Sequence, residues 1–355
     1  MSQPQPPTRQ ERILGALLGV HAGDSLGATL EFEAWEDIQR KHPAGIRDIV
    51  GGGHFGWPAG HATDDTDLTR AVLLAYRDVH RIKRLTAASP TRTVPDVVKL
   101  VGNYMLDWYD GKWPGRTRGE TPRDIGAATA KGLRKYRHTA DVRNAGSGEG
   151  SAGNGSLMRC IPTALFGPDE ATLSPSDESE SKAISAITHD DYLCTISCAA
   201  YNAIVRALID GKPVAEACQS GIKTAAILPP EAGIKLTRAC SKVQNAIEAG
   251  MSLVKVDELA NKGPKEAANA RKVLPFKAAG YVLESLTVAI AALVDPRALE
   301  EVVVDVARIG KDTDSNAAIA GGLLGARDGI EAIPPRWREK LQFGNEFEEI
   351  VEELI

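Results

Sequence analysis

The sequence predicts an all-α protein, and three observations support this fold class. Apolar residues recur at the 3.6-residue spacing of a helix that buries one face, as in the run Leu193, Ile196, Ala200, Ile204 and Leu208. Alternating β-branched runs bounded by turns, which would indicate strands, are scarce. Hydrophobic residues make up 43% of the 355 residues, which is enough to fill a substantial core.

The helical pattern recurs along the whole chain. In chain order the expected helices are Glu11–Gly23, Asp67–Arg81, Pro95–Asp110, Ile125–Tyr136, Tyr192–Ile209, Pro213–Ile227, Ile234–Ala249, Ala279–Leu293, Leu299–Ile309 and Asn316–Ile330. The main loops between them are rich in glycine, proline, serine or charge and lie at Gly51–Gly60, Asp110–Arg123, Arg137–Gly155, Gly167–Lys182 and Asn261–Pro275. Long loops beside a helical scaffold are where binding sites usually lie.

None of these loops is both long and featureless enough to be an interdomain linker. We therefore expect residues 11–355 to form one domain, preceded by a disordered tail at residues 1–10. The tail lacks the apolar stretch of a secretory signal, and the longest apolar run, Ala289–Val294, is too short to cross a membrane. No membrane partner is expected, and nothing in the sequence fixes the oligomeric state.

Charge and cysteine usage narrow the class of protein further. The formal net charge of −5 argues against a nucleic-acid binder, because such proteins usually carry a basic face. The five cysteines form no CxxC pair and are expected to be reduced thiols in the core. Reduced thiols suit an intracellular compartment, so we expect a cytoplasmic location.

Two acidic clusters stand far apart in the sequence, Thr63-Asp64-Asp65-Thr66 and Asp312-Thr313-Asp314-Ser315, each at the start of a helix of small residues. Carboxylate and hydroxyl oxygens without nearby cysteine suit hard cations such as Mg²⁺, Mn²⁺ or Ca²⁺. Four carboxylates would overcompensate one cation but balance two, which favours a binuclear centre. The alternative is that each cluster only caps its helix, because Asp and Thr accept the free N–H groups of a first turn.

Two similar segments of small residues suggest how these clusters could come together in the fold. Gly15–Gly19 and Gly321–Gly325 both contain glycines that let helix backbones approach closely. We expect the first and last helices to be buried neighbours, which would bring Asp24 and Glu31 toward the second acidic cluster.

Six motifs in order give the chain a resemblance to a known family. They are GVHAGDSLG at 19–27 with Glu31-Phe32, TDDT at 63–66, DIG at 124–126, GNGSLMR at 153–159, TH at 188–189 and KDTDSN at 311–316. Together they span nearly the whole chain, which resembles the ADP-ribosylglycohydrolases, particularly the branch typified by dinitrogenase reductase-activating glycohydrolase.

The resemblance implies a single compact orthogonal helical bundle with a central cleft. This cleft would hold two divalent cations, Mg²⁺ or Mn²⁺, and bind ADP-ribose while the bond at ribose C1″ is hydrolysed. The implied metal ligands are Thr63, Asp64, Asp65, Asp312, Asp314 and Ser315. The resemblance also makes Asp124 the general base, with helix capping as the alternative, and Glu31 the rival acid, with a solvated charge as the alternative.

The same motifs imply a set of ADP-ribose contacts. They are Gly53, His54, Phe55, Asn154, Gly155, Ser156, Met158, His189 and Lys311. The glycine-rich loop at 153–156 leads into an apolar helix, so its N–H groups could receive a pyrophosphate. For His189 we favour a supporting role over chemistry, because one histidine beside two aspartates at a helix start is more often a structural residue.

Two positions depart from the branch pattern. Ser315 replaces the commoner Thr and keeps the hydroxyl ligand, whereas Lys311 stands where the branch usually has Gly. Lys311 adds a cation that could neutralise an anionic leaving group, so we hypothesise a substrate with phosphate at C1″, such as ADP-ribose 1″-phosphate. The alternative is that Lys311 is a solvated side chain.

The resemblance thus implies a metal-dependent hydrolase that removes ADP-ribose from a modified protein side chain such as arginine or serine. One alternative is a hydrolase of a small ADP-ribose derivative, and another is a non-catalytic ADP-ribose-binding or structural relative. Acceptor contacts are expected from the loops Asp110–Arg123 and Arg137–Gly150.

Overall fold

Helices form the regular structure of the computed structural model, which describes residues 5–88, 93–229, 231–253, 255–262 and 279–355. Within these ranges no strand occurs, and the β-type pairings are two isolated bridges, Gly52–Trp57 and Gly153–Tyr281. The all-α prediction is therefore confirmed.

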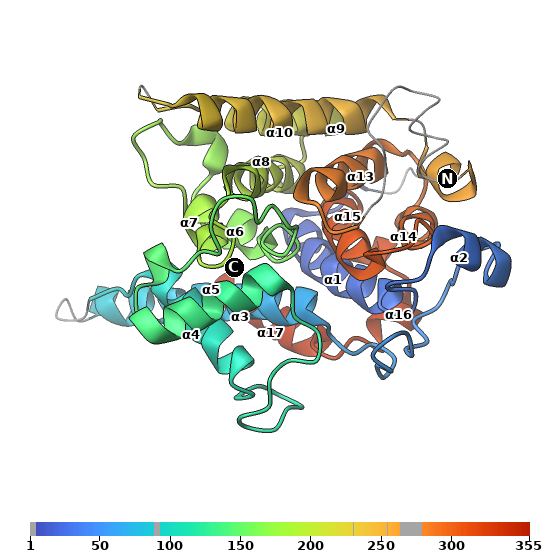
Figure 1. Cartoon of the computed structure of the whole chain (residues 1–355), viewed down its shortest axis with the longest axis horizontal. Coiled ribbons are helices and arrows are strands. Elements are labelled where there is room, and N and C mark those ends of the chain that lie inside the picture. Colours follow the sequence, from blue (N-terminus) through green and yellow to red (C-terminus); the bar gives the residue numbers. More distant parts are fainter. Residues whose placement is uncertain (1–4, 89–92, 230, 254, 263–278) are drawn as a thin grey trace.

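The helices follow one another along the chain and pack at several angles (Figure 1). They are α1 (Arg9–Gly27), α2 (Trp35–Lys41), α3 (Asp64–Ala88), α4 (Val97–Tyr109), α5 (Ala127–Thr139), α6 (Ile161–Phe166), α7 (Glu180–Ala186), α8 (Tyr192–Ile209), α9 (Val214–Ala225), α10 (Ile234–Ser252), α11 (Val256–Lys262), α13 (Val282–Val294), α14 (Leu299–Ala307), α15 (Thr313–Asp328), α16 (Pro335–Arg338) and α17 (Gly344–Leu354). Single 3₁₀ turns lie at Val142–Asn144, Glu170–Thr172 and Ile330–Ala332.

The expected helices all have a counterpart, but most bounds move. The helix Tyr192–Ile209 has the expected bounds, whereas α3 and α15 begin three residues earlier than expected, at Asp64 and Thr313. The acidic clusters thus lie in or beside the first turn of each helix instead of in the preceding loop. The predicted tail is also too long, because Thr8 and Glu11 form a capping box and α1 begins at Arg9.

Several helices were not predicted. Among them α2, α7, α11 and α16 have seven residues or fewer, which is too short to show the helical period. The longer α17 was missed although Phe347, Ile350 and Val351 bury one face of it. Most of the expected loop Asn261–Pro275 lies outside the described residues, and the helix expected at Ala279 begins at Val282.

A central pair of helices, α1 and α15, is packed closely enough that side chains are excluded from the contact (Figure 1). A Cβ atom added to Gly19 would lie 2.2 Å from the carbonyl oxygen of Gly321, and one added to Gly23 would lie 2.1 Å from that of Ala317. Gly15 and Gly27 meet α15 in the same way. The expected contact between these helices is confirmed, although α16 and α17 follow α15.

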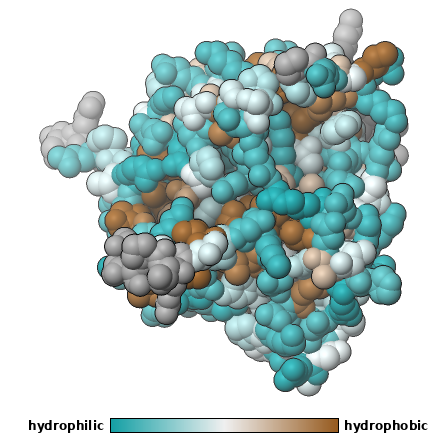
Figure 2. Space-filling model, turned by 90° about the vertical axis from the view of Figure 1, so that its left-hand side faces the viewer, coloured by the Kyte–Doolittle hydropathy of each residue, from teal (hydrophilic) through white to brown (hydrophobic). Residues whose placement is uncertain are grey.

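The core extends outward from this pair. Helices α8 and α13 are buried nearly all round and pack beneath α9 and α10, which form the top of the molecule in Figure 1. Among the described residues α8 is the helix long and apolar enough to cross a membrane, but 83% of it is buried inside the protein, as in a core helix. The face in Figure 2 is mainly hydrophilic, with small apolar patches between the helices.

The C-terminal end of α1 positions the starts of α3 and α15. Asp24 accepts hydrogen bonds from the backbone N–H groups of Thr63 (3.1 Å) and Thr66 (3.2 Å). The hydroxyl of Thr313 donates to the carbonyl of Gly27 (2.6 Å). Because both acidic helix starts are attached to the same turn of α1, the two clusters meet.

The segment after α1 is fixed by a short backbone pairing with the residue before the second cluster. The N–H of Phe32 donates to the carbonyl of Lys311 (2.7 Å), and the N–H of Lys311 donates to the carbonyl of Glu33 (2.9 Å). Phe32 and Lys311 both adopt left-handed backbone conformations, with φ of 64° and 68°. This pairing holds Glu31 over the start of α15.

The close contact between α1 and α15 gives the first prediction. We expect Gly19→Ala to lower the free energy of unfolding by about 1–3 kcal/mol or more, because the added methyl overlaps backbone that belongs to another helix. Denaturant unfolding measures this loss. Gly233→Ala is the matched control, since nothing lies within 4 Å of its Cβ position, and an equal loss in both variants would contradict the packing argument.

Candidate active site

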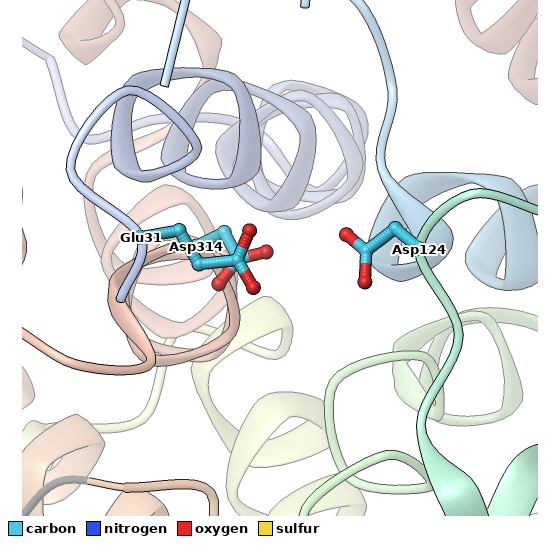
Figure 3. Close-up of side chains that lie close together, drawn as sticks. All are labelled: Glu31, Asp124 and Asp314. Carbon is cyan, nitrogen blue, oxygen red and sulfur yellow. The ribbon is translucent and has the colours of Figure 1, made fainter. Parts of the chain in front are cut away.

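Three carboxylates from separate parts of the chain meet at the centre of the cleft. Glu31 follows α1, Asp124 precedes α5, and Asp314 lies in the first turn of α15. One oxygen atom of each lies within 4.8 Å of the other two. Figure 3 shows Glu31 and Asp314 side by side, with Asp124 facing them across a gap.

The remaining predicted metal ligands lie around this group. Asp65 accepts hydrogen bonds from the hydroxyls of Thr63 (3.3 Å) and Ser315 (3.3 Å), so the two acidic clusters are in direct contact. Asp312 accepts one from the side-chain amide of Asn154 (2.6 Å). The structure therefore brings both predicted clusters together with the two predicted catalytic acids.

Burial and mutual repulsion raise the pKa values of these carboxyls. Burial, followed by the charges of Asp312 and Asp64, raises the pKa of Glu31 to about 8. Burial, followed by the charges of Asp64 and Glu31, raises the pKa of Asp124 to about 10. Burial and the charge of Asp24 raise the pKa of Asp64 to about 7. The site thus concentrates more negative charge than it can hold ionised without compensation.

The donor atoms of the site fit divalent cations. In the described part of the chain, six buried carboxylate oxygens have no hydrogen-bond partner, and five of them belong to this site: Asp24 Oδ1, Glu31 Oε2, Asp65 Oδ1, Asp124 Oδ2 and Asp314 Oδ1. Buried carboxylates without partners are costly, and a bound cation would remove that cost. All of the donors are oxygens, which Mg²⁺ and Mn²⁺ prefer.

Asp24 is a functional residue that the sequence analysis brought near the site but did not include in it. It is fully buried and holds the start of α3 through Thr63 and Thr66. Its second oxygen, Oδ1, is among the unpartnered acceptors. An aspartate within the apolar, glycine-rich α1 was the signal that could have identified it.

The carboxylates stand at the edge of a cavity of about 790 Å³, the main cavity. Its walls include Glu31, Asp64, Asp124, Asp312, Asp314 and Ser315 on one side and Thr129, Asn154, Gly155, Met158, His189, Gly280 and Lys311 around the rest. Five of the nine predicted substrate contacts therefore line this cavity. Its volume lies within the range of ~300–1,000 Å³ that is usual for small-molecule sites.

A smaller cavity of about 230 Å³, the side cavity, adjoins the same carboxylates. It is lined by Gly56, Trp57, Pro58, His61, Ala62, Thr63, Asp64, Asp67, Trp108, Gly115, Arg116, Glu120, Thr121, Pro122, Arg123 and Asp124. Asp64 and Asp124 line both cavities. The acidic cluster therefore forms the wall between them.

Four predicted substrate contacts do not line either cavity. Ser156 is buried and accepts a hydrogen bond from Ser185 (2.8 Å). The Cβ position of Gly53, with φ of 69°, lies 2.1 Å from the carbonyl oxygen of Ala28, so this glycine serves backbone packing. His54 and Phe55 contact the ring of Phe32, at centroid distances of 5.0 and 6.0 Å.

Arg159 and His189 support the glycine-rich loop at 153–156 through hydrogen bonds. Arg159 is buried and donates to the carbonyl of Gly155 and to the hydroxyl of Thr188 (2.7 Å), which also pairs with Nδ1 of His189 (2.8 Å). Burial, followed by the charge of Arg159, lowers the pKa of His189 to about 3. The imidazole is therefore neutral at ordinary pH, which favours a supporting role over proton transfer.

The structure explains why Lys311 is unusual in its position. Its φ of 68° lies in the left-handed region that glycine adopts most easily, which agrees with the glycine expected there. Its side chain is exposed and lines the main cavity. The chain thus accepts some backbone strain at a point where a cation faces the cavity.

Comparisons with known proteins agree with this geometry. A model of the ADP-ribosylglycohydrolase family matches residues 5–355. The chain is 28% identical to an ADP-ribosyl-[dinitrogen reductase] glycohydrolase of Rhodospirillum rubrum, over 94% of this chain and 92% of that protein. It is 27% identical to the ADP-ribosylarginine hydrolase Tri1 of Pseudomonas putida, over 99% of this chain and 79% of that protein.

Among solved structures, the chain is similar to an ADP-ribosylglycohydrolase-related protein complex. The TM-score is 0.66 at 25% sequence identity, and the match covers 98% of this chain and 97% of that chain. The family resemblance deduced from the six motifs is confirmed.

The raised pKa values of the clustered carboxyls predict how pH and bound cations together change the stability of the folded protein. Because the folded-state pKa values of Glu31 (about 8), Asp64 (about 7) and Asp124 (about 10) lie above their ordinary values of 4.5, 3.8 and 3.8, these groups take up protons on folding. Their contribution to stability is complete below about pH 4 and is lost as the pH rises through 7 to 10.

We therefore expect Mg²⁺ or Mn²⁺ to raise the melting temperature more at pH 8 than at pH 5 in chelator-treated protein, since at pH 5 protons already neutralise the cluster. Thermal unfolding at both pH values measures this difference. Asp314→Asn should reduce the shift, and an equal shift at both pH values would contradict the assignment of the cluster as a cation site.

Proposed function

Because this chain belongs to the ADP-ribosylglycohydrolase family, we propose that it hydrolyses the bond at C1″ of ADP-ribose in an arginine-linked protein substrate. The chain is a hydrolase, and the metal dependence of its family agrees with the unpartnered carboxylate oxygens of the cleft. The names of its relatives, an ADP-ribosylarginine hydrolase and an ADP-ribosyl-[dinitrogen reductase] glycohydrolase, support arginine as the acceptor.

The observation that carries the proposal is the meeting of Glu31, Asp124 and Asp314 beside a cavity of about 790 Å³. In a purely structural role these buried acids would remain uncompensated. Each unpaired buried charge costs roughly several kcal/mol. A cleft that only bound ADP-ribose would not need such a group at its end. The arrangement therefore favours catalysis over a non-catalytic relative.

Two Mg²⁺ or Mn²⁺ ions are proposed as the resident cofactors. Asp65, Asp312 and Asp314 would hold them, with the hydroxyls of Thr63 and Ser315, and Asp64 and Glu31 lie close enough to contribute oxygens. Bound cations of this kind polarise oxygen atoms of the substrate and stabilise the negative charge that develops in the reaction. The same carboxylates offset the charge of the cations.

Asp124 is proposed as the general base. It stands across the gap from Glu31 and Asp314 and lines both cavities (Figure 3). Bound cations would lower the pKa of Asp124 from its raised value of about 10 and keep its carboxylate ionised, so that it could take a proton from a water molecule as the water oxygen bonds to C1″. Glu31, on the opposite side of the gap, is proposed to orient the ribose and to serve as the second acid.

ADP-ribose is proposed to lie in the main cavity with its terminal ribose at the carboxylates. Asn154 and Gly155 would contact the pyrophosphate from one wall, and the ammonium group of Lys311 would face it from another. His189, held neutral and fixed by Thr188, would support the loop beneath it. These assignments extend the predicted contacts that line the cavity and leave out Ser156 and Gly53.

Substitution of the acids tests the proposed function. We expect the wild type with Mg²⁺ or Mn²⁺ to release ADP-ribose from an arginine-linked substrate faster than from serine- or 1″-phosphate-linked ones. Asp124→Asn and Asp314→Asn should each lower kcat by about 10²–10⁴, the usual loss when a catalytic base or charge stabiliser is removed.

Glu36→Gln, at an exposed glutamate away from the cleft, is the control and should keep wild-type kcat. Binding of ADP-ribose by the wild type without turnover of any of the three substrates would support the non-catalytic alternative.

Replacement of Lys311 separates backbone strain from charge. We expect Lys311→Gly to raise the free energy of unfolding by about 1 kcal/mol, because glycine relieves the left-handed conformation. The same variant and Lys311→Ala should weaken ADP-ribose binding by a similar factor, as measured by calorimetry. A selective loss of turnover on the 1″-phosphate substrate would instead support the hypothesis of an anionic leaving group.

A further inference from the structure

We propose that the side cavity is the acceptor subsite, which receives the modified arginine side chain and the adjoining peptide during hydrolysis. This inference rests on the proposed function, because it presumes that the bond at C1″ is cleaved beside Asp124. It adds a second binding site, formed by residues that none of the six motifs assigns to substrate.

The position of the side cavity is the first argument. Asp64 and Asp124 line both cavities, so the reacting carbon, held beside Asp124, lies at the boundary between them. A substrate with ADP-ribose in the main cavity must extend its acceptor group away from that cavity. The side cavity is the space that opens on the other side of the same carboxylates.

The sizes of the two cavities fit the two parts of the substrate. The main cavity, of about 790 Å³, is large enough for a dinucleotide-like ligand, and the side cavity, of about 230 Å³, falls below the usual range of ~300–1,000 Å³ for small-molecule sites. It is suited to one amino-acid side chain. ADP-ribose therefore fits the main cavity and not the side cavity.

The lining of the side cavity suits a flat cation carried by a peptide. Indole rings of Trp57 and Trp108 and two prolines provide apolar walls, and four acidic side chains face two arginines across it. A guanidinium group stacks well on such rings and pairs with carboxylates. The two indole rings favour a flat cationic side chain at this site.

Trp57 offers a further contact that has no partner within the protein. Its Nε1 atom is buried and donates no hydrogen bond in the described part of the chain. Its ring stacks on His61 at a centroid distance of 4.6 Å and an interplanar angle of 14°, which fixes its orientation. A backbone carbonyl next to the modified arginine is an acceptor that this N–H group could reach.

The opposite wall is held in place by buried hydrogen bonds. Asp67 accepts from the indole N–H groups of Trp108 (2.8 Å) and Trp113 (2.7 Å). Arg116 lies over the Trp108 ring at 5.7 Å and donates to the carbonyl of Trp108 (2.7 Å), so its charge is already engaged. Glu120 is exposed and accepts a hydrogen bond from the N–H of Thr117 (3.3 Å), and its carboxylate could accept another from a peptide N–H beside the modified arginine.

The reaction balances with the two products on opposite sides of the carboxylates. The oxygen of water bonds to C1″ as Asp124 takes one of the water's protons, and the bond between C1″ and the guanidine nitrogen breaks with its electron pair going to nitrogen. That nitrogen takes up one proton in place of the one that the water lost, so one water is consumed in all. ADP-ribose remains in the main cavity and the restored arginine in the side cavity. Each product can then leave without passing the other.

Two substrates with the same scissile bond test the inference. One is an ADP-ribosylated arginine peptide, and the other is ADP-ribosylguanidine, in which the acceptor ends at the guanidine group. We expect Trp57→Leu and Glu120→Gln each to lower kcat/KM for the peptide about tenfold more than for ADP-ribosylguanidine, because the Nε1 contact of Trp57 and the carboxylate contact of Glu120 are made to the peptide backbone, which the small substrate lacks.

Glu36→Gln is the matched control and should leave the ratio between the substrates at the wild-type value. Glu120→Gln changes an exposed side chain, so it keeps the test decisive if Trp57→Leu fails to fold. An unchanged ratio in both variants, with wild-type turnover of both substrates, would overturn the acceptor subsite alone. Absence of wild-type turnover on either substrate would overturn the proposed function together with it.

Discussion

The close contact between α1 and α15 is the constraint on which the rest of the site depends. Glycines at every fourth position of α1 remove the side chains that would hold the helices apart, so the backbones touch. The end of α1 then reaches both acidic clusters, through Asp24 to α3 and through Gly27 to Thr313. Clusters far apart in sequence become one site because a third element, lacking side chains on one face, can lie between them.

Bringing the two acidic clusters together buries several carboxylates that repel one another, and other interactions of the fold must offset this electrostatic cost. The N–H groups at the start of α3 stabilise one of the carboxylates, that of Asp24, but the other carboxylates do not all gain such partners. The pKa values of Glu31 and Asp124 rise to about 8 and about 10. A packing contact that stabilises the fold thus gathers negative charge that bound cations would compensate, so we expect folding and cation binding to be coupled.

The fold class, the acidic clusters and the contact between α1 and α15 could be predicted from the sequence because each has a local signal. The helix Tyr192–Ile209 shows a long apolar period, and TDDT and KDTDSN are compact motifs. Ser156 and Gly53, two of the predicted substrate contacts, do not line either cavity, because a motif gives a residue's position in the chain but not the direction of its side chain. The loop Asp110–Arg123 was expected to contact the acceptor, but the side cavity itself could not be predicted, since Trp57, Trp108 and Glu120 come from separate elements that only the tertiary structure brings together.

The two cavities differ in how well the sequence predicts them, and this difference agrees with the part of the substrate that each is proposed to bind. In the proposed function the main cavity binds the part that every ADP-ribosylated substrate shares, and several residues of its lining belong to compact motifs on the helix starts and the 153–159 loop. The side cavity faces the part that differs between substrates, and the long loop at 110–123 forms much of its wall. A rigid pair of glycine-packed helices can therefore hold one catalytic group while the adjoining loop changes its acceptor. On this view the identity of the acceptor is determined beside Asp124 and not by Lys311, whose side chain faces the shared part.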